Sequence, residues 1–340
     1  MKITSNNVND GLLAVLSAIH AFKELDSKVI TERDSRNGRT LSFDEPVMIV
    51  HENPNRCACF LKSRDANPFF HIFESLWMLA GRKDVKFLSL FNKNMINYSD
   101  DGIVFNAPYG YRLRHHFGID QLQGVVDALK KDPNSRQAVA LLWDPADLNK
   151  QTLDKACNLE LVFKIQDNRL DMTVFNRSND VIYGALGANA VHMSMIMMYV
   201  CSKLGCNLGK YCQISNCLHV YVDGVEGTIL NRMMNDLDND ERDKYPDRTV
   251  TPVWFDEYVD GDIQELFAMF DRKDMGLTPA RLLAIEYESK LFNDLVMPML
   301  EMYIKYKTCG KDSITEHDYN EIAAEDWRLA CRRWIQNRTK

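Results

Sequence analysis

Residues 154–180 read Asp-Lys-Ala-Cys-Asn-Leu-Glu-Leu-Val-Phe-Lys-Ile-Gln-Asp-Asn-Arg-Leu-Asp-Met-Thr-Val-Phe-Asn-Arg-Ser-Asn-Asp. Cys157 stands near the start of this stretch, and Arg177 stands near its end. Between them, residues 159–165 and 170–175 have the length and apolar composition of two strands, and a polar turn separates them. The stretch therefore predicts two neighbouring strands, with a thiol at the start of the first and an arginine after the second.

The rest of the chain has the pattern of one continuous α/β core, a mixed sheet packed with helices. Apolar residues recur at helical spacing in residues 9–24, 67–90, 119–131 and 191–204. Further strand-like runs lie at residues 41–50, 138–143 and 211–221. We expect the methionines of residues 191–204 to fill the core.

The last third of the chain differs in composition. Residues 234–247 are acidic and polar, which predicts a loop, and helical patterns return at 261–271, 279–306 and 319–336. We therefore expect a core of residues 1–221. Residues 222–340 are expected to form an acidic loop and a helical extension that packs on the core.

The composition restricts the class of partner. A chain of 340 residues with 46% hydrophobic composition can bury one large core. Its formal net charge of -7 gives no general attraction to polymeric nucleic acid, although a basic pocket can still bind one anionic nucleotide. No apolar run reaches the roughly 18 residues that span a bilayer, and the N-terminus lacks the apolar centre of a signal peptide. We expect a cytoplasmic protein that binds no membrane.

The nine cysteines are scattered, which favours reduced thiols over a disulfide framework. Cys212, Cys217 and His219 lack the second pair of ligands that a closed zinc site needs. No metal is therefore expected.

Two charged features inside this pattern each have two interpretations. Residues 31–40 crowd three arginines around Gly38, as in a loop that binds phosphate or in a solvated turn. Glu74 lies within the apolar helix of residues 67–90. A carboxylate there either pairs, points into a cavity or takes up a proton, unless it lies at the edge of the helix.

The thiol of Cys157 also has two interpretations. Beside Arg177 it can ionise to a thiolate and act as a nucleophile, with Ser178 as an added phosphate donor. The alternative is a neutral thiol that packs under the sheet. Thiolate chemistry suits pyrimidines, because carbon 5 of the ring becomes a nucleophile once a thiolate has added at carbon 6.

Seven motifs occur in one order between residues 30 and 221. They are Ser-Arg-Asn-Gly-Arg-Thr (35–40), Phe-Glu-Ser-Leu-Trp-Met-Leu-Ala-Gly (73–81), Pro-Tyr-Gly-Tyr-Arg (108–112), Asp-Pro-Asn-Ser-Arg (132–136), Cys157, Arg-Ser-Asn-Asp (177–180) and His-Val-Tyr (219–221). In this order they resemble the thymidylate synthase and pyrimidine hydroxymethylase superfamily. The resemblance implies the fold of that superfamily, and it does not cover the C-terminal extension.

The resemblance also implies an activity and a set of roles. The activity is transfer of a one-carbon unit from 5,10-methylenetetrahydrofolate to carbon 5 of dUMP or dCMP, in a homodimer. The implied roles are nucleophile (Cys157), acid-base groups (Glu74 and Tyr109), phosphate ligands (Arg36, Arg177, Ser178 and, from the partner subunit, Arg136), sugar ligands (His219 and Tyr221) and folate ligand (Asp180).

Several departures from the synthase pattern concern the product. Asn158 stands where synthases usually carry histidine, and Gln137 stands where a second arginine is usual. Met95 and Tyr98 fall at two tryptophan positions, so water has more room near the reactive methylene group. Together with a C-terminus that lacks an apolar closing tail, these changes favour a 5-hydroxymethyl product, as in the phage-type hydroxymethylases.

The base remains open at this stage. An ungapped count from Arg177 places Ala188 at the position that reads the base, and Asn189 follows one residue later. An asparagine with a flipped amide can read either uracil or cytosine. The alternatives to a hydroxymethylase are a true thymidylate synthase, which releases dihydrofolate, and a catalytically inactive nucleotide-binding relative.

Overall fold

The structure is a computed structural model, and it describes residues 1–25, 28–237, 245, 255–272 and 286–338. The described strands form two sheets. In spatial order the larger sheet contains β1 (Lys2–Ser5), β4 (Val47–His51), β9 (Asn207–Ser215), β7 (Arg169–Asn176), β6 (Asn158–Gln166) and β5 (Val139–Leu141). The smaller sheet contains β2 (Ile30–Ser35), β3 (Gly38–Phe43), β10 (Leu218–Tyr221) and β8 (Asn179–Asp180). Both sheets contain parallel and antiparallel pairs, so the predicted mixed α/β fold is confirmed.

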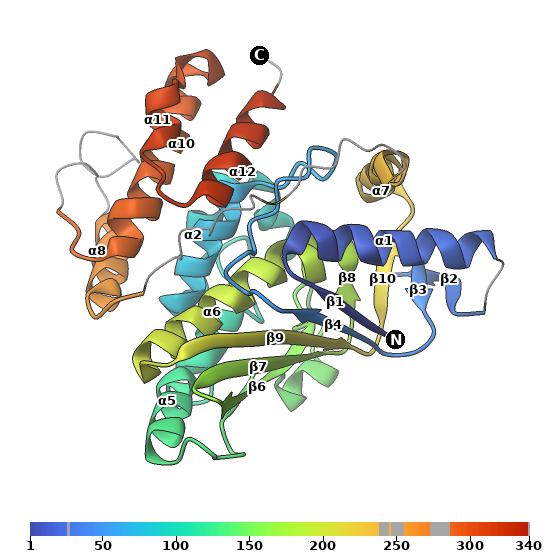
Figure 1. Cartoon of the computed structure of the whole chain (residues 1–340), viewed down its shortest axis with the longest axis horizontal. Coiled ribbons are helices and arrows are strands. Elements are labelled where there is room, and N and C mark those ends of the chain that lie inside the picture. The colour runs from blue at the N-terminus through green and yellow to red at the C-terminus, as the bar shows by residue number, and fades with distance from the viewer. Residues whose placement is uncertain (26–27, 238–244, 246–254, 273–285, 339–340) are drawn as a thin grey trace.

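Helices cover one face of the larger sheet, with α6 lying along β9 and α1 beside β1 (Figure 1). The first half of the chain contains α1 (Val8–Glu24), α2 (Pro68–Leu79), α3 (Val85–Phe91), η1 (Lys93–Tyr98), α4 (Tyr109–Tyr111), η2 (Arg112–His116), α5 (Gln121–Lys131) and η3 (Pro145–Leu148). The second half contains η4 (Val181–Ala188), α6 (Asn189–Leu204), α7 (Gly224–Leu237), α8 (Val259–Asp271), η5 (Phe292–Val296), α10 (Met297–Cys309), η6 (Lys311–Ser313), α11 (Glu316–Asn320) and α12 (Glu325–Gln336).

Local signals fix the ends of the helices that carry the site. Asn67 caps α2 by accepting a hydrogen bond from the Phe70 N–H at 3.1 Å, and Pro68 occupies the first turn. Gly205 ends α6 with φ of +66°, a left-handed conformation that glycine adopts without strain. These caps explain why the helix predicted at 191–204 ends at the expected residue and why α2 begins at Pro68 as predicted. The apolar segment 67–90 is not one helix, however: α2 ends at Leu79, next to Gly81, and α3 begins at Val85.

The hairpin of β6 and β7 has the predicted position and a two-residue turn. Asp167 and Asn168 have φ of +50° and +56°, as a tight hairpin turn requires. The turn pairs Gln166 with Arg169, but a bulge between Asn158 and Glu160 shifts the register by one residue. As a result, Arg177 rather than Ser178 lies opposite Cys157, and the Arg177 N–H donates to the Cys157 carbonyl at 3.0 Å.

Three predicted segments are wrong in detail, and inside two of them the chain passes from one sheet to the other. Residues 31–40 form the hairpin of β2 and β3 rather than a loop, with Gly38 at φ of +129° after the turn. The single strand predicted at 41–50 is two strands, β3 and β4, in different sheets. The strand predicted at 211–221 likewise divides into β9 and β10.

The helical patterns of the last third correspond to α8, to η5 with α10, and to α11 with α12. Two of them are shorter than predicted: residues 286–289 are not helical, and a break at 321–324 separates α11 from α12. Most of the acidic segment 234–247, and residues 279–285, lie outside the described residues.

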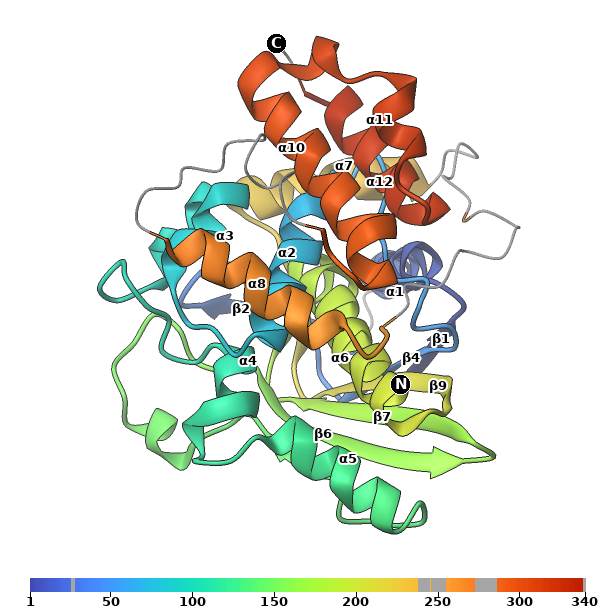
Figure 2. The same ribbon diagram turned by 90° about the vertical axis from the view of Figure 1, so that its left-hand side faces the viewer.

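Helices α10 and α12 lie beside α2 (Figure 2). The Phe69 ring of α2 contacts the rings of Tyr303 and Trp334, with centroids 5.0 and 5.4 Å apart. The division at residue 221 stays a prediction, and the buried apolar side chains on both sides of it belong to one cluster.

The helical residues Val181–Leu204 are long enough and apolar enough to cross a membrane, by length and composition alone. The prediction that no such run exists is therefore wrong. Polar residues interrupt the run in the sequence, but its mean hydropathy over the most apolar window is 1.4. Because 78% of that window is buried inside the protein, its apolar character is that of a core helix.

Candidate active site

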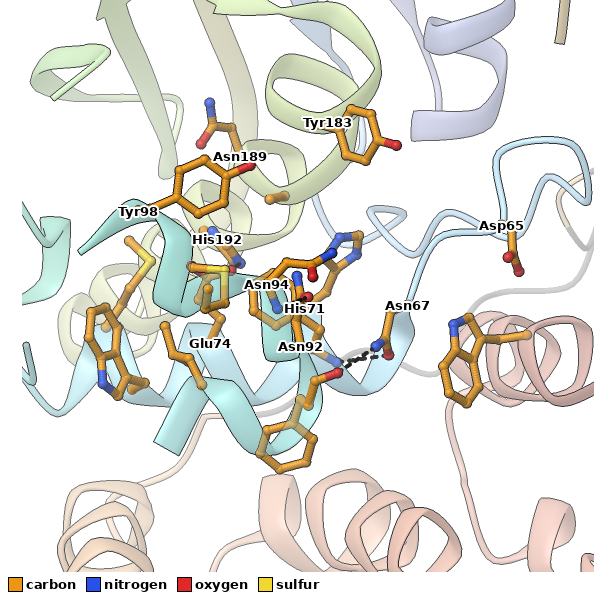
Figure 3. Close-up of a pocket in the computed structure, with 18 of the residues that line it drawn as sticks. Asp65, Asn67, His71, Glu74, Asn92, Asn94, Tyr98, Tyr183, Asn189 and His192 are labelled. Carbon is orange, nitrogen blue, oxygen red and sulfur yellow. Dashed lines mark hydrogen bonds and ion pairs between the residues drawn. The ribbon is translucent and has the colours of Figure 1, made fainter. Parts of the chain in front are cut away.

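A cavity of about 880 Å³ lies between α2, η1, the start of α6 and the C-terminal helices. Four of the residues expected in the site line it: Glu74, Tyr109, Ala188 and Asn189. Met95 and Tyr98, the two positions occupied by tryptophan in synthases, also line it. Figure 3 shows Glu74, Tyr98 and Asn189 among the side chains around this space. The cavity therefore gathers residues from segments that are distant in the sequence.

Cys157 lies next to this cavity at the start of β6. The Tyr109 hydroxyl, which belongs to the cavity wall, accepts hydrogen bonds from the N–H groups of Cys157 and Asn158 at 3.1 and 3.3 Å. The Arg177 guanidinium donates to the Cys157 sulfur, with Nη2 3.6 Å from Sγ. A thiol held against a guanidinium is arranged to act as a thiolate.

Burial and the neighbouring charges shift the pKa of the Cys157 thiol in opposite directions. Burial raises the pKa of the thiol above its ordinary value, and the carboxylates of Asp154 and Asp180 raise it as well. The positive charges of Arg177 and Arg36 lower the pKa. In the free protein burial prevails, so the thiol is mainly protonated near neutral pH.

The two arginines are fixed on the loop that precedes β6. Arg36, in the turn between β2 and β3, donates to the carbonyls of Thr152 and Leu153 at 3.3 and 3.2 Å. Arg177 donates to the Ala156 carbonyl at 2.8 Å. Held there, both guanidinium groups flank the thiol with N–H groups left for an anion. Ser178 is half-buried beside Arg177.

Asp180 and His219 are paired neighbours on the parallel strands β8 and β10. Burial raises the pKa of Asp180. Burial lowers the pKa of His219, but contacts with Cys217 and the charge of Asp180 outweigh it and raise the pKa overall. The rings of His219 and Tyr221 meet edge to face at 5.2 Å. The folate and sugar ligands implied by the resemblance therefore lie together, next to the thiol that Asp180 influences.

Glu74 and His192 face each other inside the cavity. His192 Nε2 lies 3.1 Å from Glu74 Oε2, yet neither atom has a hydrogen-bond partner within the described part of the chain. The side chains are 15% and 4% exposed, respectively. The His71 ring meets the His192 ring edge to face at 6.3 Å, and burial lowers the pKa of His71 well below its ordinary value. Glu74 thus points into the cavity beside an imidazole.

A chain of side-chain amides runs from the core to Asn189. The Gln213 Nε2 group donates to the Ala185 carbonyl at 2.7 Å, and the Gln213 carbonyl oxygen accepts from Asn179 Nδ2 at 3.2 Å. The Asn179 carbonyl oxygen in turn accepts from Asn189 Nδ2 at 3.2 Å. A backbone carbonyl can only accept, so the first bond fixes the orientation of all three amides. Nδ2 of Asn189 is therefore directed toward the core.

Within one subunit, no contact among the described residues holds Arg136 near the Cys157 thiol. It is exposed on the loop between α5 and β5. Its side chain makes no hydrogen bond or ion pair within the described ranges of the chain. A role for Arg136 in this site requires a second copy of the chain.

Several residues of the site were not predicted from the sequence. His192 follows Asn189 by three positions and so shares its face of α6, which is the signal that points to it. Asn179 and Gln213 lie on strands and carry no such signal. The C-terminal helices also contribute to the cavity wall, through Tyr303, Tyr306, Lys307, Trp334 and Arg338.

This arrangement defines a class of enzyme. A thiol beside two arginines, next to a cavity with a carboxylate, an imidazole and an oriented amide, serves nucleophilic catalysis on an anionic ligand. The sequence profile of the thymidylate synthase family matches residues 24–247. The chain belongs to this family, and the resemblance drawn from the seven motifs is confirmed.

Three phage proteins are similar in sequence to this chain. A deoxyuridylate hydroxymethyltransferase from Pseudomonas phage M6 is 37% identical over 322 residues, which are 90% of this chain and 87% of that protein. A protein of the same name from Bacillus phage SP01 is 45% identical over 216 residues, or 59% of this chain and 56% of that protein. A third protein of this name, from Delftia phage PhiW-14, is 29% identical over 191 residues, which are 53% of this chain and 52% of that protein.

Replacing Arg177 by glutamine is expected to move the alkylation of Cys157 to higher pH. Arg177 lowers the pKa of the thiol, so its loss raises that pKa and reduces the thiolate fraction at any given pH. The measurement is the rate of iodoacetamide labelling of the Cys157 peptide over a pH series. Arg169→Gln, at the far end of the same hairpin, should leave the curve in place, and an unmoved curve for Arg177→Gln would contradict the role.

Proposed function

We propose that the protein transfers a one-carbon unit from 5,10-methylenetetrahydrofolate to carbon 5 of dUMP and releases 5-hydroxymethyl-dUMP. The observation that carries this proposal is the contact of the Cys157 thiol with Arg177, beside a cavity that presents Glu74 and Asn189. The names of the phage relatives agree with both the nucleotide and the product.

The orientation of Asn189 supports uracil as the base. Its Nδ2 group is engaged by the carbonyl oxygens of Asn179 and Asn158 at 3.2 and 3.5 Å. This leaves the Asn189 carbonyl oxygen to accept a hydrogen bond from the cavity. N3 of uracil carries a hydrogen and can donate it, whereas N3 of cytosine is an acceptor and would face another acceptor. Burial lowers the pKa of His51 to about 4, so its neutral ring can accept from Gln213 and adds support to the chain.

The wall beside the base supports the hydroxymethyl product. Met95 and Tyr98 of η1 line the cavity where synthases place tryptophans, and Tyr98 is 52% exposed. An open wall admits water to a methylene group on carbon 5, and water gives the hydroxymethyl group. Exclusion of water would favour hydride transfer from the folate and a methyl product.

The residues around the cavity fit a folate. A volume of about 880 Å³ accommodates a ligand of this size together with a nucleotide base. Tyr183 lines the cavity, and its N–H donates to the Asp180 carboxylate, which we propose as the pterin ligand. Lys307 lines the end of the cavity at α10 and could meet a carboxylate of the folate tail, whereas Arg338 at the same end is bound to Asp65 through both terminal nitrogens. The bound cofactor would supply the one-carbon unit at the oxidation level of formaldehyde.

The residues of the chain then take distinct roles. Arg36, Arg177 and Ser178 bind the phosphate, while His219 and Tyr221 contact the sugar. Phosphate and C6 of the base approach Cys157 together, and the thiolate adds to C6. Glu74 organises proton transfers around the base, and the Tyr109 hydroxyl, held in place by the N–H groups of Cys157 and Asn158, assists removal of the proton from carbon 5.

We also propose that two chains form a dimer through the outer face of the larger sheet. Val139 and Leu141 on β5 are 39% and 45% exposed. The same face continues through the half-buried side chains of Val162, Phe175 and Ile214. Glu160, opposite Leu141, and Thr173, opposite Val162, share this face, which is otherwise apolar. Exposed apolar side chains gathered on one sheet face are typical of an interface. Arg136, in the loop that leads into β5, would enter the partner's phosphate site from this face.

Leu141→Glu is expected to give a monomer with little activity, because the new carboxylate would be buried in the interface and the partner's Arg136 would be lost. Sedimentation velocity at micromolar protein measures the mass, and product formation measures the activity. Leu25→Glu is the matched control, since Leu25 is 75% exposed at the C-terminal end of α1 and lies outside the sheet. An active monomer, or an undisturbed dimer, would count against this interface.

The function is tested by incubating the protein with 5,10-methylenetetrahydrofolate and either dUMP or dCMP. The mass of the nucleotide product and the absorbance of dihydrofolate are followed in the same reaction. We expect 5-hydroxymethyl-dUMP without dihydrofolate. A methyl product with stoichiometric dihydrofolate would make the protein a thymidylate synthase, and binding of dUMP without any product would make it an inactive relative.

The organisms of these relatives bear on the compartment in which the protein acts. Because the similar hydroxymethyltransferases belong to phages, we propose that the protein acts in the cytoplasm of a bacterial host on free nucleotides. No role on polymeric nucleic acid or at a membrane is part of this proposal.

A further inference from the structure

We infer that His192 is the group that takes the proton from the water that attacks the methylene intermediate. The inference rests on the proposed hydroxymethylation, and it assigns a residue to the step that separates a hydroxymethylase from a synthase. The roles proposed above assign Glu74 and Tyr109 to proton transfers around the base ring, and they name no group that takes the proton of this water.

The geometry singles out His192. Its ring is buried on α6, three residues after Asn189, and so lies on the helix face that reads the base. Its Nε2 atom has no hydrogen-bond partner in the described structure, and neither does Glu74 Oε2 at 3.1 Å. Both atoms belong to residues that line the cavity, and Figure 3 shows the two side chains adjacent.

Nε2 of His192 and Oε2 of Glu74 lie close together without a hydrogen bond, so a shared partner is expected. A buried polar atom without a hydrogen bond is destabilising, and a water that contacts both residues from the cavity would satisfy both atoms. The water can donate one hydrogen to His192 Nε2 and accept from or donate to the carboxyl group of Glu74. His71, the nearest ring on α2, is kept neutral by its lowered pKa and therefore does not compete as a cation.

The proposed step balances without any oxidant or reductant. A methylene group on C5 of the base, conjugated with the C4 carbonyl, is the electrophile while Cys157 is bound to C6. The water oxygen forms a bond to the methylene carbon, and the π electrons move onto the C4 oxygen. Nε2 of His192 accepts the proton of the water. The enolate then reforms the C5–C6 double bond and expels the Cys157 thiolate, which leaves 5-hydroxymethyl-dUMP.

The test compares His192→Gln and His192→Asn with the unmodified protein, using dUMP tritiated at carbon 5. Tritium release reports the steps up to loss of the C5 proton, and the hydroxymethyl nucleotide reports the attack of water. We expect both variants to release about one tritium per site in a burst, while product forms on the order of 10²-fold more slowly. Intact-protein mass should show the nucleotide bound at Cys157. His20→Gln, an exposed histidine on α1, should behave as the unmodified protein.

Other results overturn the inference. Product formation at an undiminished rate would show that His192 accepts no essential proton. Loss of the tritium burst together with the product, with dUMP still bound by calorimetry, would place His192 before the water step. Restoration of product by added imidazole in His192→Ala is expected, and its absence in a folded variant that still gives the burst would count against a proton-accepting role. If the unmodified protein makes no hydroxymethyl product, that result contradicts the proposed function itself, and the inference about His192 falls with it.

Discussion

Replacing Cys157 by serine is expected to lower kcat for product formation by roughly 10⁴-fold or more, with little change in the Kd for dUMP. The serine hydroxyl has nearly the same size and can still accept from Arg177, whose Nη2 lies 3.6 Å from the sulfur. A hydroxyl in that place stays protonated, however, and cannot add to C6. The phosphate ligands are untouched, so nucleotide binding should persist.

Product formation by mass, and dUMP binding by titration calorimetry, separate these two effects. Cys309→Ser is the matched control, because Cys309 is exposed at the end of α10 and outside the cavity. It should retain full activity. Turnover within tenfold of the unmodified protein in Cys157→Ser would exclude the covalent route, whatever the product.

The second large effect is expected at Asn189. Asn189→Asp should reverse the base preference, changing the ratio of kcat/KM for dUMP and dCMP by roughly 10³-fold or more in favour of dCMP. The carboxyl oxygen that replaces Nδ2 would face the Asn179 carbonyl oxygen, which now accepts from Nδ2 at 3.2 Å, so the aspartate loses this bond and can direct its one proton to the cavity. The Gln213 amide, held by the Ala185 carbonyl, opposes a flip of Asn179. A protonated or reoriented aspartate can donate to N3 of cytosine but clashes with the N3 hydrogen of uracil.

Competition between dUMP and dCMP in one reaction measures the ratio directly. Asn94→Asp provides the control, since Asn94 lines the same cavity without belonging to the amide chain. It should leave the base preference unchanged while altering the charge of the cavity equally. A similar shift in both variants would mean that charge, rather than the hydrogen bond of Asn189, sets the preference.

Much of the fold could be predicted because its signals are local. The hairpin from Cys157 to Arg177 follows from alternating apolar residues and a two-residue turn. The helix that carries Glu74 follows from an asparagine cap, a proline and an apolar run. Two of the errors occur where the chain changes sheets, as between β3 and β4. Both strands are apolar there, and no periodicity reports which sheet a strand joins.

The sequence by itself determined the reactive groups: a thiol, an arginine placed near it by the hairpin, and a carboxylate in an apolar helix. Only the tertiary structure decided how those groups face each other. The one-residue bulge that places Arg177 opposite Cys157, and the approach of Glu74 to His192, depend on packing. The amide of Asn189 is oriented from Ala185 through Gln213 on a distant strand, because hydrogen bonds act between side chains that folding, and not the order of residues, brings together.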